Sequence, residues 1–367
     1  MKIPFGDLYA QYLSIKEEID HAIEEVIKQT AFIRGPFVEN FEINFAARHQ
    51  MKHCIGVANG TDAIYIVLKM LGIGEGDEVI TTAVSWISTS ETISQTGARP
   101  VFVDIEPDYY TIDPSKIEEK ITEKTKAIIP VHLYGQPADV IKIKTLCDKY
   151  NLILIEDCAQ AHFAEIEGRM IGTFGIASTF SFYPGKNLGA YGDAGAILTN
   201  DDELARKARM YANHGALKKH FHEFEGVNSR LDGLQAAILN TKLTFIDKWT
   251  NKRIAAAAKY SSLLSDVNEI VTPKTRENSK HVFHVYIIRV EKRDELQKKL
   301  NEAGIETAIH YPTALPNMPA YKYLNHKPSD FPVASAYQEK ILSLPIFPEM
   351  TDEQISYVVD SIRNSNK

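Results

Sequence analysis

The chain has 367 residues, of which 44% are apolar and 24% are charged, and its formal net charge is −7. This is the composition of a globular protein with a large core, and the negative charge argues against a general nucleic-acid binder, which needs a basic surface. The sequence has no apolar run of the roughly 20 residues that span a membrane, and its start lacks a signal-peptide core. Since its three cysteines have no metal-like spacing, we expect a cytoplasmic protein that holds no metal and binds neither nucleic acid nor a membrane.

Short β-branched apolar runs alternate with helical patterns over the first two-thirds of the chain. Residues 62–71 have apolar residues at helical spacing, and Asp113 before Pro114 indicates another helix start. The run 152–155 is apolar on both sides of the pleat, as in a parallel sheet that helices cover. Further strands are predicted at 78–81, 100–104, 127–131, 179–182 and 195–199. The alternation predicts an α/β domain with a mostly parallel sheet.

The pattern changes after a long helical stretch at 231–264. The elements predicted after it are a strand at 281–290, a helix at 293–303, a strand at 305–310 and a helix at 352–363. This group fits a smaller α+β domain. We therefore predict a large α/β domain over residues 1–245 and a small C-terminal domain over residues 246–367.

Polar residues follow two of the predicted strands, where sheets of this kind bind their ligands. Asp157 comes after the strand at 152–155, and Lys186 comes after the strand at 179–182. This pair suits pyridoxal phosphate (PLP), which needs a lysine amine for a Schiff base and an acid to keep its ring nitrogen protonated. From spacing alone, Asp157 could instead be a cap and Lys186 a surface lysine.

Two further runs are candidates for contacts with the same cofactor. Gly60 and Thr61 directly precede the first helical pattern, where free amides and the helix dipole favour a phosphate. Alone, this run could be an ordinary N-cap. Trp86 follows the strand at 78–81 and could stack on a flat ring or belong to the core.

Together these runs resemble the DegT/DnrJ/StrS-type sugar aminotransferases, a branch of the fold-type I PLP-dependent enzymes. The resemblance covers almost the whole chain. The runs that carry it are 3–8 (IPFGDL), 35–42 (GPFVENFE), 59–63 (NGTDA), 130–136 (PVHLYGQ), 156–162 (EDCAQAH), 181–186 (SFYPGK), 228–237 (NSRLDGLQAA) and 310–311 (HY).

The resemblance implies a role toward the cofactor ring for four residues. Lys186 would form the Schiff base and carry the proton between cofactor and substrate. Asp157 would pair with the ring nitrogen, Gln160 would bond the ring hydroxyl, and Trp86 would stack on the ring. A dehydratase branch of the family has histidine at the lysine position, so Lys186 implies amino transfer.

The resemblance also implies how the phosphate is held. Gly60, Thr61 and Ser181 would bind it within the chain. Asn228 matches an asparagine that reaches the phosphate from the neighbouring subunit in the family. A homodimer with two shared active sites is therefore implied.

The run 183–195 resembles family members that aminate C3 of a keto-sugar, whereas C4 members more often show a Thr-Gly-Glu-Gly-Gly-like run after the lysine. The implied reaction moves the amino group of L-glutamate to a dTDP-linked 3-keto-6-deoxyhexose and gives a dTDP-3-amino-3,6-dideoxyhexose. The alternatives are a UDP-linked 3-keto uronate, a 4-keto sugar, or a regulator that binds PLP and a sugar nucleotide without turnover.

Tyr183 and His310 are the candidates for sugar contacts, although each could have a structural role. His132 and His162 could contact the cofactor or support its surroundings. Phe163 stands where the family often has glycine and could alter the sugar pocket or only the packing. The charge-rich stretch 218–223 is predicted to be an exposed loop, which could border the nucleotide or only face solvent.

Overall fold

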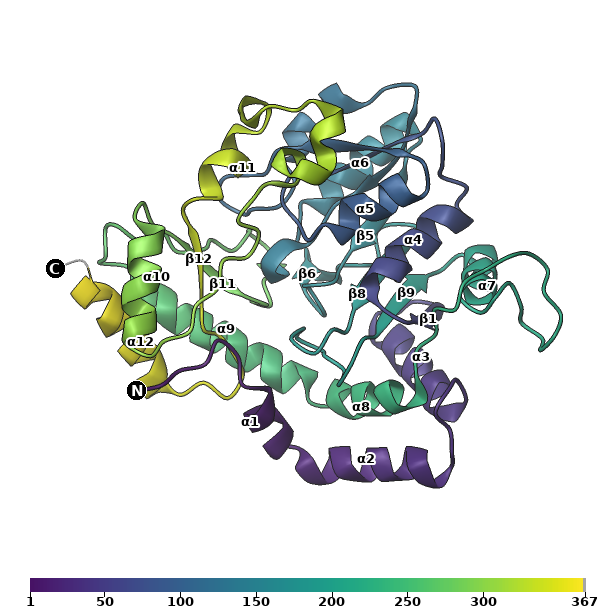
Figure 1. Ribbon diagram of the computed structural model, residues 1–367, viewed down its shortest axis with the longest axis horizontal. Coiled ribbons are helices and arrows are strands. Elements are labelled where there is room, and N and C mark those ends of the chain that lie inside the picture. Colours follow the sequence, from purple (N-terminus) through teal and green to yellow (C-terminus); the bar gives the residue numbers. More distant parts are fainter. Residues whose placement is uncertain (366–367) are drawn as a thin grey trace.

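The computed structural model describes residues 1–365. In this part of the chain, seven strands form one sheet in the order β1-β9-β8-β5-β4-β2-β3 (Figure 1). These strands are β1 (His53–Val57), β2 (Glu78–Thr82), β3 (Arg99–Val103), β4 (Thr125–Ile129), β5 (Ile153–Asp157), β8 (Ala177–Ser181) and β9 (Gly195–Thr199). Among these seven, β9 alone runs in the opposite direction to the other strands, which confirms the predicted mostly parallel sheet.

Helices cover both faces of this sheet because neighbouring strand residues point to opposite sides. Ile128 of β4 packs in the core on one face, and Ile129 packs in the core on the other. Helices α4 (Gly60–Met70), α5 (Ser88–Gln95) and α7 (Asp202–Tyr211) cover the Ile129 face. Helices α2 (Lys16–Lys28), α3 (Pro36–Arg48), α6 (Val140–Tyr150) and α8 (Gly233–Leu243) cover the Ile128 face. The prediction of a helix-covered α/β sheet is confirmed.

Two predicted helix starts differ in detail from the structure. The helix predicted at 62–71 begins at Gly60, because the Asn59 side chain accepts a hydrogen bond from the Asp62 amide at 2.8 Å and caps it. Asp113 also acts as a cap, but only of a 3-10 turn, Pro114–Lys116, and a second 3-10 turn follows.

The C-terminal part of the chain forms a second group of elements around its own core. It contains α9 (Ile246–Leu263), β11 (Tyr286–Arg289), α10 (Arg293–Glu302), β12 (Ile341–Leu344) and α12 (Asp352–Ser365). Helix α11 (Pro332–Tyr337) instead packs through Ala334 in a separate core that includes Phe102 of β3. The smaller elements elsewhere are α1 (Leu8–Leu13), β6 (Glu165–Ile166), β7 (Arg169–Met170) and β10 (Ser279–Lys280).

The strand predictions for this part were partly wrong. The strand predicted at 281–290 is interrupted, because Phe283 has a φ of 44° and regular pairing resumes only at Tyr286. Residues 305–310 form isolated bridges rather than a strand. The strand that pairs with β11 is β12, in an apolar run that was not predicted.

The long helical stretch predicted at 231–264 consists of α8 and α9, which meet near Phe245. Helix α9 links the two cores: Trp249 packs in the core of the large sheet, whereas Tyr260 packs in the C-terminal core. Ile3 packs in the C-terminal core and forms a bridge with Ile305, so the start of the chain lies against the C-terminal group of elements (Figure 1). The division at residue 245 stays a prediction.

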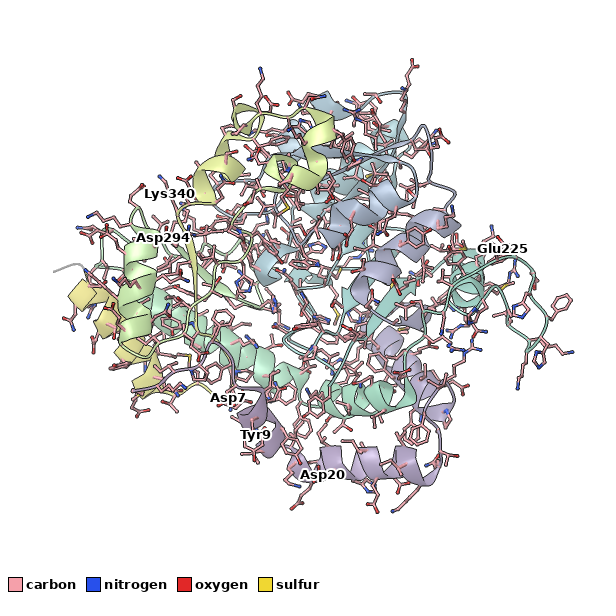
Figure 2. All side chains as sticks on the ribbon, in the orientation of Figure 1. Asp7, Tyr9, Asp20, Glu225, Asp294 and Lys340 are labelled. Atoms are coloured by element: carbon pink, nitrogen blue, oxygen red, sulfur yellow. The ribbon has the colours of Figure 1, made fainter. Side chains whose placement is uncertain are left out.

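The segment between α7 and α8 projects from one end of the molecule (Figure 1). Figure 2 shows Glu225 in this segment, at the opposite end from Asp294 and Lys340. Residues 218–223 are exposed there, as predicted. A search of residues 1–365 finds no helix that is long and apolar enough to cross a membrane.

Candidate active site

A cavity of about 780 Å³ opens at the carboxyl end of the parallel strands. It lies between the strand ends, the start of α4 and segments from the C-terminal part of the chain. The predicted site residues that line it are Gly60, Thr61, Trp86, Asp157, Gln160, Ser181, Tyr183, Lys186 and His310. The structure thus brings together nine of the residues that the sequence singled out.

Lys186 and Asp157 both line this cavity, and the charge of each affects the pKa of the other. Burial lowers the pKa of the Lys186 amine to about 8, and the Asp157 carboxylate acts in the opposite direction. Burial also raises the pKa of Asp157. Each group is therefore held where its charged form is destabilised unless an opposite charge is near, which is typical of a functional site.

Asp157 is oriented by two hydrogen bonds. The Thr89 hydroxyl donates to Oδ2 at 2.8 Å, and the Ala159 amide donates to Oδ1 at 3.1 Å. Thr89 is in turn 2.9 Å from the Ser85 hydroxyl. Thr89 was not predicted as a site residue, although it lies only three residues after Trp86, which was. A carboxylate fixed in this way can hold a cation in one place.

The start of α4 and the end of β8 come very close together. A Cβ atom on Gly60 would lie 2.7 Å from the Cβ of Ser181, so no larger residue fits at position 60. The Thr61 hydroxyl is 2.7 Å from that of Ser88. Free amides at a helix start, with hydroxyls from α4 and β8 beside them, form a suitable site for a phosphate.

Two residues with strained backbones, Tyr134 and Tyr311, hold the side chain of Gln160. Its Oε1 accepts a hydrogen bond from the Tyr134 amide at 2.7 Å, and its Nε2 donates to the Tyr311 hydroxyl. Tyr134 and Tyr311 have φ values of 60° and 68°, a region that bulky residues rarely occupy. Such strain is concentrated at functional sites. Tyr311 lies in the quoted motif but had no predicted role.

The mouth of the cavity is aromatic. Trp86 is 62% exposed and Tyr183 is 59% exposed, although both rings line the cavity. His310 lies deeper, with Nδ1 2.7 Å from the Ser343 hydroxyl. Burial lowers the pKa of His310 to about 4, so its ring is neutral at pH 7. These rings are placed to contact a ligand that enters the cavity.

Asn228 is exposed and, within the described residues, lies outside this cavity. Its backbone forms a bridge with Asn213. The next residue, Ser229, accepts a hydrogen bond from the Ala58 amide at 3.2 Å through its hydroxyl. The structure of one chain therefore does not bring Asn228 to the predicted phosphate site of that chain.

His132 and His162 are buried, and in the part of the chain that the structure describes neither lines the cavity. His132 Nε2 lies 3.2 Å from Glu156, which also accepts three backbone amides from the loop 172–175. His162 packs between Phe180 and Phe182. Both support the strands beneath the site. The carboxylate oxygens of Glu156 are fully used, which leaves it unsuited to a metal.

Phe163 has a φ of 61°, which explains why glycine suits this position. Its ring is buried, its centroid lies 4.8 Å from that of the tilted His49 ring, and the Arg48 guanidinium lies over it. In residues 1–365 it is not part of the cavity wall. The departure from the usual glycine therefore alters the packing behind the sheet.

The residues of the cavity fit PLP. The Lys186 amine, with its lowered pKa, suits the aldehyde, and the buried Asp157 carboxylate suits the ring nitrogen. The helix start at Gly60 cannot carry a side chain and faces Ser181, which suits the phosphate. An exposed indole at the mouth suits a flat ring.

Known proteins are similar to this chain over almost its whole length. The sequence model of the DegT/DnrJ/EryC1/StrS aminotransferase family matches residues 13–363. A pleiotropic regulatory protein of Geobacillus stearothermophilus is 48% identical over 99% of this chain and 98% of its own length. The dTDP-3-amino-3,6-dideoxy-alpha-D-galactopyranose transaminase of Aneurinibacillus thermoaerophilus is 44% identical over 98% of both chains.

A solved structure is similar to this chain over its whole length. The X-ray crystal structure of S. venezuelae DesV in complex with a ketimine intermediate covers 100% of this chain and 99% of its own. The TM-score is 0.97 and the sequence identity is 42%. This chain therefore shares its fold with that solved structure.

Proposed function

The chain belongs to the DegT/DnrJ/EryC1/StrS aminotransferase family, and on this premise we propose which keto-sugar it aminates and which residues do so. It is a PLP-dependent sugar-nucleotide aminotransferase. We propose that L-glutamate gives its amino group to C3 of a dTDP-linked 3-keto-6-deoxyhexose, and that the product is a dTDP-3-amino-3,6-dideoxyhexose. The observation that carries the proposed site is the Lys186 amine, whose pKa is lowered to about 8, in the same cavity as the buried Asp157 carboxylate.

Lys186 is proposed to bind the cofactor and to move the proton at the reacting carbon. When bound, PLP supplies an aldehyde carbon and an electron-withdrawing ring. With a pKa of about 8, roughly a quarter of the Lys186 amines are neutral at pH 7.5. A neutral amine can act as a nucleophile and accept a proton, whereas its protonated form can donate one.

The neighbouring residues are proposed to orient the cofactor. Asp157, fixed by Thr89, holds a proton on the ring nitrogen. Gln160, fixed by Tyr134 and Tyr311, bonds the ring hydroxyl, and Trp86 covers one face of the ring. Two backbone-anchored polar groups at fixed positions define the plane of the ring, which favours reaction in one geometry.

The phosphate is proposed to rest on the start of α4. Gly60 and Thr61 offer amides and a hydroxyl, and Ser181 offers a hydroxyl from β8. This end of the helix carries a partial positive charge. The site thus anchors the end of the cofactor that does not react.

Two observations support a 3-keto-6-deoxyhexose as the acceptor of the amino group. The run 183–195 resembles that of family members that aminate C3, and the A. thermoaerophilus relative, by its name, makes a 3-amino-3,6-dideoxy sugar nucleotide. Tyr183 and His310 line the cavity beside Lys186 and are proposed to contact the hexose. A UDP-linked 3-keto uronate and a 4-keto sugar are the competing acceptors.

A homodimer with shared sites is proposed because the chain leaves one predicted residue unused. Asn228 is exposed and outside the cavity of its own chain, so it is free to reach the phosphate of a neighbour. Trp86 and Tyr183 expose large rings at the cavity mouth, a surface that a second chain would cover. The three buried thiols in the described part of the chain support a reducing, cytoplasmic location.

A second candidate is a regulator that binds PLP and a sugar nucleotide. It is favoured by the name of the 48% identical G. stearothermophilus relative, a pleiotropic regulatory protein. Adding glutamate to the PLP-loaded protein distinguishes the two functions. Glutamate should change the absorbance of the bound cofactor of an aminotransferase, whereas a regulator without turnover would leave the spectrum unchanged.

The acceptor is tested with purified protein, L-glutamate and a panel of keto-sugar nucleotides. The panel contains the dTDP-linked 3-keto-6-deoxyhexose, a UDP-linked 3-keto uronate and a dTDP-linked 4-keto sugar. We expect the mass of the amino sugar nucleotide from the first compound. Turnover of the 4-keto sugar without turnover of any 3-keto sugar would contradict the proposal.

A further inference from the structure

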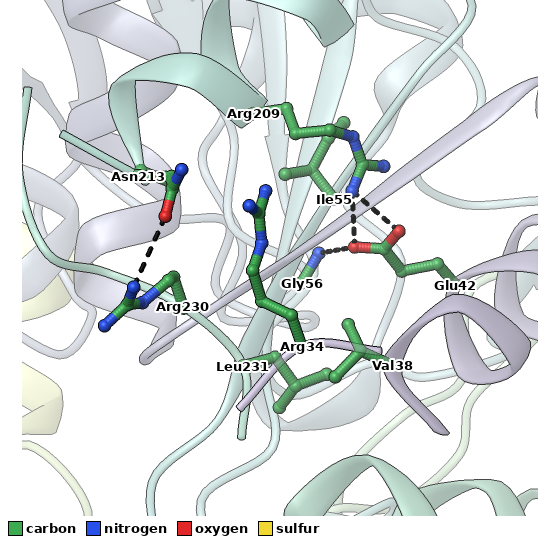
Figure 3. A pocket seen from close by; sticks show the side chains of 10 residues that line it. Arg34, Val38, Glu42, Ile55, Gly56, Arg209, Asn213, Arg230 and Leu231 are labelled. Carbon is green, nitrogen blue, oxygen red and sulfur yellow. Dashed lines mark hydrogen bonds and ion pairs between the residues drawn. The ribbon is translucent and has the colours of Figure 1, made fainter. Parts of the chain in front are cut away.

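Three arginines surround a small pocket between α3, the end of β1 and the end of α7 (Figure 3). One of them, Arg209, has a carboxylate partner, since its Nη1 lies 2.8 Å from the nearer oxygen of Glu42. Its Nη2 donates to the Cys54 carbonyl at 2.9 Å, and Glu42 also accepts the Gly56 amide. Arg209 therefore forms a structural ion pair with the buried Glu42 carboxylate.

The other two arginines, Arg34 and Arg230, lack a carboxylate partner. Within residues 1–365, the Arg34 side chain has no hydrogen bond and no ion pair. Arg230 donates only to the neutral Asn213 amide oxygen, at 3.4 Å. Figure 3 shows the Arg34 guanidinium between the Asn213–Arg230 pair and the Arg209–Glu42 pair. The pocket thus carries two positive charges without a counter-charge.

This arrangement is unfavourable for the isolated chain. Arg34 is partly buried and has a φ of 58°, a strained value for a residue with a long side chain. Burial lowers its pKa, and the nearby charges of Arg209 and Arg230 lower it further. Like charges in a partly dry pocket repel each other. An anion that binds there would remove this repulsion.

The pocket lies beside Asn228 rather than beside Lys186. Arg230 is two residues after Asn228, and Asn213 on the pocket wall pairs with Asn228 through its backbone. In the described part of the chain, the pocket shares no wall residue with the Lys186 cavity. In the proposed dimer, whatever surrounds Asn228 is carried to the mouth of the neighbouring site.

We propose that Arg34, with Arg230 at its side, binds the diphosphate of the sugar nucleotide that reacts in the neighbouring subunit. This role rests on the proposed function and on the proposed dimer. Arginine suits it because the planar guanidinium bonds phosphate oxygens with two parallel N–H groups.

The position and charge of the pocket favour a diphosphate over the carboxylates of glutamate. The α-carboxylate of glutamate is attached to the reacting carbon and must lie in the Lys186 cavity. The diphosphate is attached at C1 of the hexose, away from the reacting C3, and carries a double negative charge that matches Arg34 and Arg230. The interior of the pocket, about 20 Å³, has room for one oxygen of an anion whose remainder stays at the open mouth.

The first test measures equilibrium binding of dTDP to the PLP-loaded enzyme. Arg34→Gln should weaken binding about 10- to 100-fold, the usual effect of losing a charge-assisted hydrogen bond. The matched control is Arg206→Gln: Arg206 lies one turn before Arg209 on α7 but pairs with Glu203 and Glu223 and is not on the pocket wall. Equal dTDP affinity of wild type and Arg34→Gln would overturn the proposal.

The kinetic form of the same test separates the two substrates. In Arg34→Gln, KM for the sugar nucleotide should rise by the same factor, while the rate with glutamate alone stays unchanged. A loss confined to the glutamate reaction would assign the pocket to the amino donor and overturn the diphosphate role. Because dTDP binding needs no turnover, it reports on Arg34 even if the proposed acceptor is wrong.

The second test asks whether Arg34 acts across the dimer. Arg34→Gln and Lys186→Ala chains are co-expressed, and the mixed dimer is isolated by two tags. In that dimer, one site combines Lys186 of the first chain with Arg34 of the second, so the KM for the sugar nucleotide should return to the wild-type value. A KM that stays high would show that Arg34 serves its own chain and would overturn the proposal.

Discussion

Two of the walls that line the cavity of Lys186 are built in different ways. The strand-end wall consists of Gly60, Asp157, Ser181 and Lys186, which lie at the ends of strands or the start of a helix. The C-terminal wall consists of His284, His310 and Tyr311, which come from irregular segments between β10 and α11. The first is fixed by the hydrogen bonding of the large sheet, whereas the second depends on side-chain contacts with residues such as Ser343.

This difference separates chemistry from substrate choice. Proton transfer and ring binding need positions fixed within a fraction of an ångström, which a packed parallel sheet provides. Recognition of different sugars needs a wall that can vary without altering the sheet, which irregular segments provide. Changes in the strand-end wall should therefore affect both halves of the reaction: the one in which glutamate loses its amino group and the one in which the sugar gains it. Changes in the C-terminal wall should affect only the second.

The largest effect is expected from Lys186→Ala. Without the amine, both halves of the reaction should fall by about 10⁴-fold or more, as is typical when a covalent catalyst is removed. Cofactor absorbance and product mass measure this loss, and circular dichroism checks that the variant is folded. A variant that still transferred amino groups at a substantial rate would show that another residue is the catalyst.

Asp157→Asn should have the next largest effect, about 10²-fold on both halves of the reaction, because the charge opposite the ring nitrogen is lost. The matched variant Thr89→Val removes the hydrogen bond to Asp157 Oδ2 but keeps the charge, and it should cost about tenfold or less. Single-turnover rates with glutamate measure both. Equal losses of rate in the two variants would mean that the rate depends on the orientation of the Asp157 side chain and not on its charge.

The pH dependence of cofactor uptake should show the lowered pKa of Lys186. Only the neutral amine reacts with the aldehyde, so the uptake rate of the cofactor-free protein should rise about tenfold per pH unit below the pKa of about 8 and level off above it. Stopped-flow absorbance between pH 6 and 9.5 measures the rate. An increase that continues beyond pH 9 would indicate an ordinary lysine.

The same measurement on Asp157→Asn tests the coupling of the two groups. The Asp157 carboxylate raises the pKa of Lys186, against the larger effect of burial. Without that charge, the pKa should fall and the levelling should move to lower pH. An unchanged profile would show that the two side chains are too far apart to interact.

The strand-end wall could be predicted from sequence because each of its residues lies in a short contiguous run. Asp157 ends the strand β5, Lys186 comes five residues after the end of β8, and Gly60 begins the amphipathic helix α4. Local pattern therefore places all three at one edge of the sheet. Thr89 was missed because it lies 68 residues from Asp157 in the chain. A hydroxyl that orients an acid from another element has no local signal.

The C-terminal wall was less predictable. His284 lies in a segment that was predicted to be a regular strand but is irregular, because Phe283 takes a positive φ. The strand β12, which carries Ser343, was missed although Ile341–Leu344 is an apolar run. Position in such segments is set by packing against distant parts of the chain, which no local pattern records.

The smallest effect is expected from His310→Gln in the C-terminal wall. The neutral ring of His310, with Nδ1 near Ser343, can contact the hexose through Nε2, and glutamine places its amide in a similar region. KM for the sugar nucleotide should rise about three- to tenfold, the usual effect of one neutral hydrogen bond. The matched variant Ser343→Ala removes the support of the ring and should give a smaller rise of the same kind.

The two halves of the reaction decide whether this wall serves the sugar alone. If His310→Gln slows the glutamate half as much as the sugar half, His310 takes part in catalysis. The proposal that the C-terminal wall acts only in sugar recognition would then be wrong. If only the sugar half changes, a neutral histidine on an irregular segment selects the acceptor, while the sheet beneath it carries out one unchanged reaction. The C-terminal wall is then the place to alter acceptor choice, since substitutions there leave Lys186 and Asp157 in position.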